Sequence, residues 1–129
     1  MSNPNENPVG FVEIPVTNLE RAIQFYTAVF GYDFTVEEVD GNRMAFSPFD
    51  EQRPGVSFAL TQGEIYVPGH HGAVVYLNTL DIDATIARAA TQGSKQLYPK
   101  SSIGPRGFVA EFEDSEGNRI ALYQPPAAE

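Results

Sequence analysis

A chain of 129 residues with 42% hydrophobic and 19% charged side chains has the composition of one globular domain, not of a disordered segment. Its 17 acidic and 8 basic residues give a formal charge of −9, which argues against nucleic acid or an anionic membrane surface as a partner. Because the sequence has no cysteine, disulfides, thiolate nucleophiles and cysteine-ligated metals are excluded.

The apolar stretches of the chain are short. Residues 72–77 form one of the longest, and it falls well below the roughly 20 residues of a membrane-spanning helix. The N-terminal sequence MSNPNENP has neither a basic region nor an apolar run of the kind found in signal peptides. We therefore expect a cytoplasmic protein without a membrane segment.

The chain opens with a predicted strand and helix. Residues 11–16 have the apolar character of a strand, and Asn18 is a preferred residue at the start of a helix. Apolar side chains then recur at helical spacing as far as Phe30. Gly31 follows, and glycine tolerates the left-handed backbone conformation that ends many helices.

Three strands complete the first half. Residues 33–39 and 43–47 predict a hairpin around Asp40-Gly41, a pair that accepts the positive φ angles of a tight turn. A charged loop containing proline leads to the last strand, residues 56–62. We therefore expect a βαβββ module over about residues 10–62.

The same order of elements starts again after a linker over residues 63–71. A strand at residues 73–78 precedes Asp81, a second preferred helix cap, and a helix over residues 82–90. Gly93 ends this helix, and three strand-like stretches follow. The second half predicts another βαβββ module over about residues 72–124.

A repeat in the sequence supports two related modules. Residues 55–62 read GVSFALTQ, and residues 117–124 read GNRIALYQ at an offset of 62. The two helix caps, Asn18 and Asp81, lie 63 residues apart. Two copies are too few for a solenoid, but they suit a pair of modules related by a pseudo-twofold axis.

Two stretches resemble the motifs of a known family. Residues 15–31 begin PVTNLERA and continue with Phe-Tyr and Val-Phe-Gly, which resembles the opening of the vicinal-oxygen-chelate superfamily of glyoxalases, bleomycin-resistance proteins and dioxygenases. Residues 114–120, DSEGNRI, resemble the family's Asp-Pro-x-Gly-Asn turn, with serine in place of proline. The resemblance implies an α+β fold in which two βαβββ modules form a cupped mixed sheet. It also implies one domain over residues 1–129 and a homodimer.

Enzymes of this family place metal ligands on the first and last strands of each module, facing into the cup. The resemblance puts these four positions at Phe11, Ala59, about Val74 and Ala121. Four apolar side chains offer no donor set for a divalent ion, so we expect no metal ligands and no cofactor. A divalent metal remains the alternative if the register is shifted by one or two residues.

Glu13 interrupts the apolar first strand on the same face as Phe11, which should line the cup. A carboxylate buried there is costly unless it is paired, hydrated or bound to a ligand. One hypothesis makes Glu13 a general base, a ligand-binding carboxylate or a lone metal donor, with a raised pKa if the side chain is buried. The other makes it structural, hydrogen-bonded across the module or dimer boundary to Tyr76, its equivalent in the repeat.

Aromatic side chains supply the remaining candidate ligand contacts. Together with Phe11 and Glu13, we expect Tyr76 and Tyr123 to line the cup, although ordinary strand aromatics are the simpler interpretation. The turn at residues 104–107 resembles a mobile loop at the mouth of the cup, where Arg106 would meet an anionic ligand. A plain surface turn is the alternative.

The two histidines of the chain, His70 and His71, are adjacent. On an extended strand their side chains point to opposite faces, which weakens them as a joint metal chelate. Histidine titrates near neutral pH, so proton transfer is one hypothesis, and a solvated linker is the other.

Two functions compete. The first is a glyoxalase-like protein that binds a small organic ligand in its cup, with lyase or isomerase chemistry as its enzymatic form and Glu13 as its acid or base. The second is a non-catalytic, metal-free protein that sequesters a small molecule such as an antibiotic, for which the charge of −9 favours a cationic ligand. A purely structural accessory domain is a third, weaker interpretation.

Overall fold

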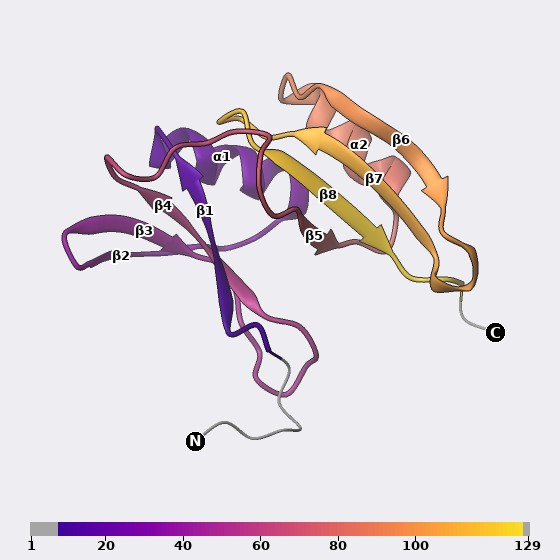
Figure 1. The fold of residues 1–129 in the computed structure, drawn as a ribbon, viewed down its shortest axis with the longest axis horizontal. Coiled ribbons are helices and arrows are strands. Elements are labelled where there is room, and N and C mark those ends of the chain that lie inside the picture. The colour runs from indigo at the N-terminus through magenta and orange to yellow at the C-terminus, as the bar shows by residue number, and fades with distance from the viewer. Residues whose placement is uncertain (1–7, 128–129) are drawn as a thin grey trace.

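The protein consists of two four-stranded sheets, each with one helix, in a computed structural model that describes residues 8–127 (Figure 1). The first sheet and its helix comprise β1 (Phe11–Val16), α1 (Leu19–Phe30), β2 (Thr35–Val39), β3 (Asn42–Phe46) and β4 (Ser57–Gln62). The second comprises β5 (Val75–Asn78), α2 (Ile82–Thr91), β6 (Gln96–Ser102), the short 3-10 helix η1 (Gly104–Arg106), β7 (Phe108–Glu113) and β8 (Arg119–Gln124). Each half has the predicted βαβββ order.

The two sheets share one topology. Their strand orders are β1-β4-β3-β2 and β5-β8-β7-β6, and in each sheet the first strand pairs in parallel with the last while the remaining pairs are antiparallel. This confirms the predicted fold class of two βαβββ modules. We call them module one and module two.

Local signals set the turns and the helix starts. Asp40 and Gly41 have φ angles of 54° and 81° and connect β2 to β3, as the Asp-Gly pair predicts. The side chains of Asn18 and Asp81 accept hydrogen bonds from backbone N–H groups in the first turns of α1 and α2. Strand starts differ by about two residues from the prediction, because β2 begins at Thr35 and β5 at Val75.

The repeated glutamine has a structural role in both modules. The Oε1 atom of Gln62 accepts a 2.8 Å hydrogen bond from the N–H of Leu19, and that of Gln124 accepts one of the same length from Ile82. Each glutamine ends the last strand of its module and satisfies an N–H group at the start of that module's helix. This shared contact gives a physical reason for the matching ends of the two repeats.

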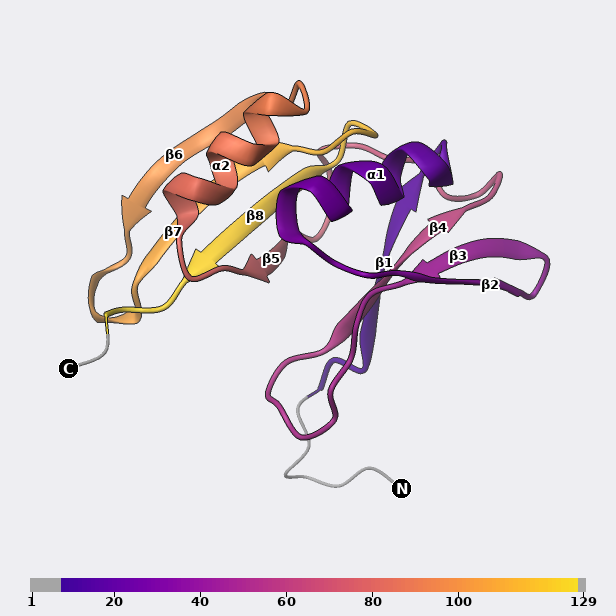
Figure 2. The same cartoon turned by 180° about the vertical axis from the view of Figure 1, so that it is seen from behind.

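One core is shared by the two modules. Figure 2 shows α1 and α2 on the same side of the sheets, and the two helices contact each other. Phe25 of α1 packs against Phe112 of β7 with ring centroids 6.0 Å apart. Among residues 8–127, no helix lies over the opposite sides of the sheets, and we call these the uncovered faces. Neither α1 nor α2 is long and apolar enough to cross a membrane.

Polar contacts close the helix side of the molecule at a seam formed by α1, α2 and the turn at residues 114–118. The Glu116 carboxylate accepts hydrogen bonds from the N–H groups of Thr17 and Asn18, both at 2.9 Å, and from Arg21. At the other end of α1, Arg88 Nε donates to the carbonyl oxygen of Val29 at 2.7 Å. Module two therefore places a carboxylate at the N-terminus of α1 and a guanidinium at its C-terminus, which complements the helix dipole.

Candidate functional site

β1 contributes side chains to both faces of the module-one sheet, because alternate side chains of a strand point in opposite directions. Ile14 and Val16 are buried in the core beneath the helices. Phe11 and Glu13 lie on the other face, and Phe11 is 53% exposed. The structure therefore places both predicted residues on the uncovered face, as the alternation predicts.

Glu13 is exposed in the single chain, a point that the sequence left open. Its oxygens accept hydrogen bonds of 3.2 and 3.3 Å from the hydroxyl of Tyr66 and one of 3.4 Å from Thr61 Oγ1. Burial of its hydroxyl and the charges of Glu13 and Asp40 raise the pKa of Tyr66. The neighbour of Glu13 is thus a tyrosine that the sequence analysis did not identify.

Within the single chain Glu13 bonds to Tyr66 and not to Tyr76, so a hydrogen bond to Tyr76 across a dimer boundary stays a prediction. Tyr76 pairs with Ala121 as Glu13 pairs with Ala59, so the two residues are equivalent in the repeat, but they lie on different sheets. Tyr66 belongs to the linker, where no hydrophobic period predicts the direction of a side chain. The only signal available was a lone aromatic residue in a linker rich in glycine and proline.

Tyr76 and Tyr123 come together on the uncovered face of module two. They line a hollow of about 440 Å³ together with Ile103, Arg106 and Val109. Tyr76 is 51% exposed, whereas Tyr123 is half-buried. Two aromatic rings with apolar and cationic neighbours form a surface suited to a small organic molecule.

The turn beside this hollow, at residues 104–107, is held by hydrogen bonds to β8 and within itself. The hydroxyl of Tyr123 donates to the carbonyl oxygen of Arg106, and Ile103 N–H donates to Gly107 O at 2.9 Å. Gly107 has a φ of +119°, and a Cβ at this position would lie 2.2 Å from the carbonyl oxygen of Gln124. Glycine is therefore required where the turn crosses the end of β8.

The four predicted ligand-binding residues fall into two groups in the single chain. Phe11 and Glu13 belong to β1, and Glu13 lines a hollow of about 250 Å³ between the two sheets, with His71 and Arg119 on its other side. Tyr76 and Tyr123 line the separate hollow on module two. The structure thus brings the two tyrosines together and leaves the β1 pair apart from them.

The charged side chains near these hollows are largely paired. Arg119 forms a two-pronged ion pair with Glu111, with N···O distances of 2.7 and 2.9 Å, and this hydrogen bonding lowers the pKa of Glu111. His70 Nε2 lies 2.7 Å from an oxygen of Glu113. The two histidines therefore have different surroundings, because His71 lines the hollow that contains Glu13.

The positions that hold metal in family enzymes carry no donors here. Phe11, Ala59 and Ala121 lie on β1, β4 and β8, and Val74 immediately precedes β5. Within residues 8–127, no group of three or more His, Asp or Glu side chains is arranged to hold a metal ion. These side chains do not fit the metal site that the family implies.

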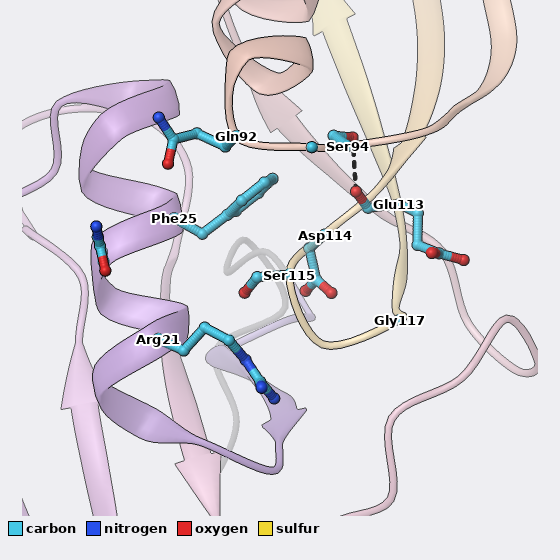
Figure 3. Close-up of a pocket in the computed structure, with 10 residues that line it drawn as sticks. Arg21, Phe25, Gln92, Ser94, Glu113, Asp114, Ser115 and Gly117 are labelled. Carbon is cyan, nitrogen blue, oxygen red and sulfur yellow. Dashed lines mark hydrogen bonds between the residues drawn. The ribbon is translucent and has the colours of Figure 1, made fainter.

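A further hollow, of about 340 Å³, lies at the seam on the helix side (Figure 3). Its lining includes Arg21, Phe25, Gln92 and Asp114. Asp114 is 5% exposed, and its carboxylate accepts a 2.6 Å hydrogen bond from Tyr26 as well as bonds from the turn itself. Burial raises the pKa of Asp114 despite these hydrogen bonds.

The carboxylates at this seam form hydrogen bonds that join the two modules. Hydrogen bonds from Arg21, Asn18, Thr17 and Ser115 outweigh the effect of burial and lower the pKa of Glu116 to about 2. Asp114 is likewise satisfied by internal donors. The hollow of Figure 3 is therefore part of the packing between the modules, and the uncovered faces are the better candidate site.

Comparisons with known proteins agree with this fold. Residues 9–122 match the model of the Glyoxalase/Bleomycin resistance protein/Dioxygenase superfamily. A glyoxylase-like domain-containing protein of Didymella fabae is 34% identical over 120 residues, which are 89% of this chain and 91% of that protein.

Two solved structures from Streptomyces sp. CB03234 are also similar. One is TnmS3, an antibiotic binding protein, with a TM-score of 0.71 and 28% identity over 96% of this chain and 100% of that chain. The other is a glyoxalase/bleomycin resistance protein, with a TM-score of 0.68 and 29% identity over 89% of this chain and 98% of that chain.

Proposed function

The chain belongs to the Glyoxalase/Bleomycin resistance protein/Dioxygenase superfamily, and we propose that it is a binding protein for a small organic molecule. The observation that carries this proposal is the hollow lined by Tyr76 and Tyr123 on an uncovered face. The similarity to TnmS3 supports it, because that antibiotic binding protein matches nearly the whole chain. We place this function in the cytoplasm, in keeping with the acidic, cysteine-free sequence.

A second copy of the chain completes the ligand site in this proposal. The seam closes the helix side within one chain, while half-exposed Phe11 and Tyr76 remain on the uncovered faces. Pairing the module-one face of one copy with the module-two face of another brings the two groups of predicted ligand residues to one cup. The homodimer would also bury apolar side chains that a single chain leaves in water.

We propose that the cup works without a resident metal. Phe11, Ala59, Val74 and Ala121 stand where the family's metal ligands would, and none of them donates to a metal. Sequestration of the ligand is therefore favoured over the metal-dependent chemistry of family enzymes. The rival is a lyase or isomerase in which Glu13 is the general base, favoured by its exposed carboxylate and its hydrogen bond to Tyr66.

Ligand-observed and protein-observed NMR with a panel of aromatic natural products tests the binding function. We expect stoichiometric binding with shifts at Tyr76 and Tyr123, and loss of binding in Tyr76→Ala and Tyr123→Ala. Tyr98→Ala is the matched control, since Tyr98 is an exposed tyrosine of the same sheet outside the hollow. Product formation that requires an added divalent metal would overturn sequestration in favour of the enzyme.

A further inference from the structure

We propose that the uncovered face of module one contains a recognition subsite for a protonated amine, formed by Glu13 and oriented by Tyr66 and Thr61. This inference rests on the proposed binding function and names the chemical class of its ligand: an organic ammonium carried on an aromatic or apolar body. Tyr66 acts here as a positioning residue, through its hydrogen bond to Glu13.

The geometry of Glu13 leaves room for a ligand. A carboxylate has about four acceptor sites. The Tyr66 hydroxyl and Thr61 Oγ1 occupy part of this capacity and restrict the rotation of the carboxylate. Thr61 is fully buried beneath it, whereas Glu13 itself is exposed and reachable from solvent.

In the described part of the chain the Glu13 carboxylate forms no ion pair, and Arg119, which lines the same hollow, is paired with Glu111. Within residues 8–127, no nitrogen of Lys, Arg or His forms an ion pair with Glu13 at 4.0 Å or less, although Glu111 and Glu113 have such partners. A carboxylate that is hydrogen-bonded only by neutral donors can still form an ion pair with a cation. A cationic ligand would form a charge-assisted hydrogen bond with Glu13.

The surrounding charge favours a cation over an anion. Residues 8–62 contain eight Asp and Glu side chains and three Arg, whereas residues 72–124 contain six acidic and five basic side chains. Asp40 also contributes to the raised pKa of Tyr66, whereas His71 and Arg119 lie on the far side of the hollow. Anionic ligands would be repelled from this side of the cup, and cationic ligands would be concentrated there.

The neighbours of Glu13 favour an organic amine over a bare metal ion. A divalent metal needs several oxygen or nitrogen donors around one point, and the described residues show no such group here. Phe11 lies two residues before Glu13 on the same face and is 53% exposed. An ammonium group can pair with Glu13 while its aromatic or apolar body packs against Phe11.

Three naphthalene probes that share one ring system test the subsite: 1-naphthylmethylamine, 1-naphthylmethanol and 1-naphthoate, titrated by NMR at pH 7. We expect the amine to bind about tenfold tighter than the alcohol, since a charge-assisted hydrogen bond is about twice as strong as a neutral one, and the carboxylate to bind weakest. The isosteric substitution Glu13→Gln should remove the preference for the amine. Tyr66→Phe should reduce it without abolishing it.

Glu37→Gln is the matched control, because it removes one carboxylate from the same face of module one, on β2, and should leave the preference within about twofold. Equal binding of all three probes, unchanged by Glu13→Gln, would overturn the amine subsite and leave the proposed binding function standing. Failure of all three to bind at millimolar concentration would contradict both. A well-dispersed spectrum of each variant establishes that it is folded.

Discussion

The seam between the helices and the uncovered faces of the sheets use their polar side chains in opposite ways. At the seam, Glu116 accepts several hydrogen bonds from the start of α1, and Asp114 accepts one from Tyr26 and others from its own turn. On the uncovered faces, Glu13 has only neutral donors, and Phe11 and Tyr76 are half exposed. Hydrogen bonds formed within the seam contribute to stability. The carboxylate of Glu13 and the exposed rings can instead contact a ligand or a second copy of the chain.

Asp114 provides the strongest test that hydrogen bonds at the seam contribute stability. Replacing it with alanine leaves the buried hydroxyl of Tyr26 and the amide of Asn118 without their acceptor, and we expect a loss of about 3–5 kcal/mol in the free energy of unfolding. Urea denaturation followed by circular dichroism measures this. Asp50→Ala is the control, because that carboxylate is exposed and should change stability by less than about 0.5 kcal/mol. A loss below about 1 kcal/mol for Asp114→Ala would show that water replaces the carboxylate.

The contribution of Glu116 to the stability of the seam should depend on pH. Its pKa of about 2 in the folded protein lies below the ordinary value of 4.5, so its stabilising effect is present above about pH 4.5 and is lost as the pH falls toward 2. At pH 7 we expect Glu116→Gln to lower the free energy of unfolding by about 1–3 kcal/mol. The difference between wild type and variant should shrink between pH 4.5 and 2. A difference that stays constant over this range would contradict the contribution of the Glu116 charge.

Arg88 tests the other end of α1. Its Nε donates to the carbonyl oxygen of Val29, so Arg88→Met keeps an unbranched side chain and removes the hydrogen bond and the charge near the helix terminus. We expect a loss of about 1 kcal/mol in the free energy of unfolding, measured by urea denaturation. Lys95→Met is the control for loss of one positive charge in module two. Equal effects of the two substitutions would mean that only net charge matters.

How far the sequence predicts these features depends on the distance over which each signal acts. The caps at Asn18 and Asp81 and the Asp-Gly turn lie next to the elements they begin or join, so local patterns predict them. The repeat ending in Gln62 and Gln124 predicts a second module in the same way.

The contacts that sequence reasoning missed join distant segments. Tyr66 reaches Glu13 across 53 positions, and Glu116 reaches Thr17 across 99. No hydrophobic periodicity around either residue indicates the direction of its side chain. Face alternation along β1 did predict where Glu13 lies, but its exposure depends on what covers that face, and no property of the strand itself determines this.

We expect the smallest change in stability on the uncovered faces. A substitution there should reduce ligand binding without reducing stability, which distinguishes these faces from the seam. Tyr76→Ser removes a half-exposed ring whose neighbours in its hollow remain in place, so unfolding of dilute protein should change by less than about 1 kcal/mol. Ligand binding should fall about tenfold or more, because truncating a tyrosine that anchors a bound partner costs about 2 kcal/mol or more. Titration of the best-binding aromatic compound and urea denaturation of the same sample measure both. If Tyr76→Ser instead destabilised the protein as much as Asp114→Ala while binding was retained, the uncovered face of module two would be structural, and the ligand site would have to lie elsewhere.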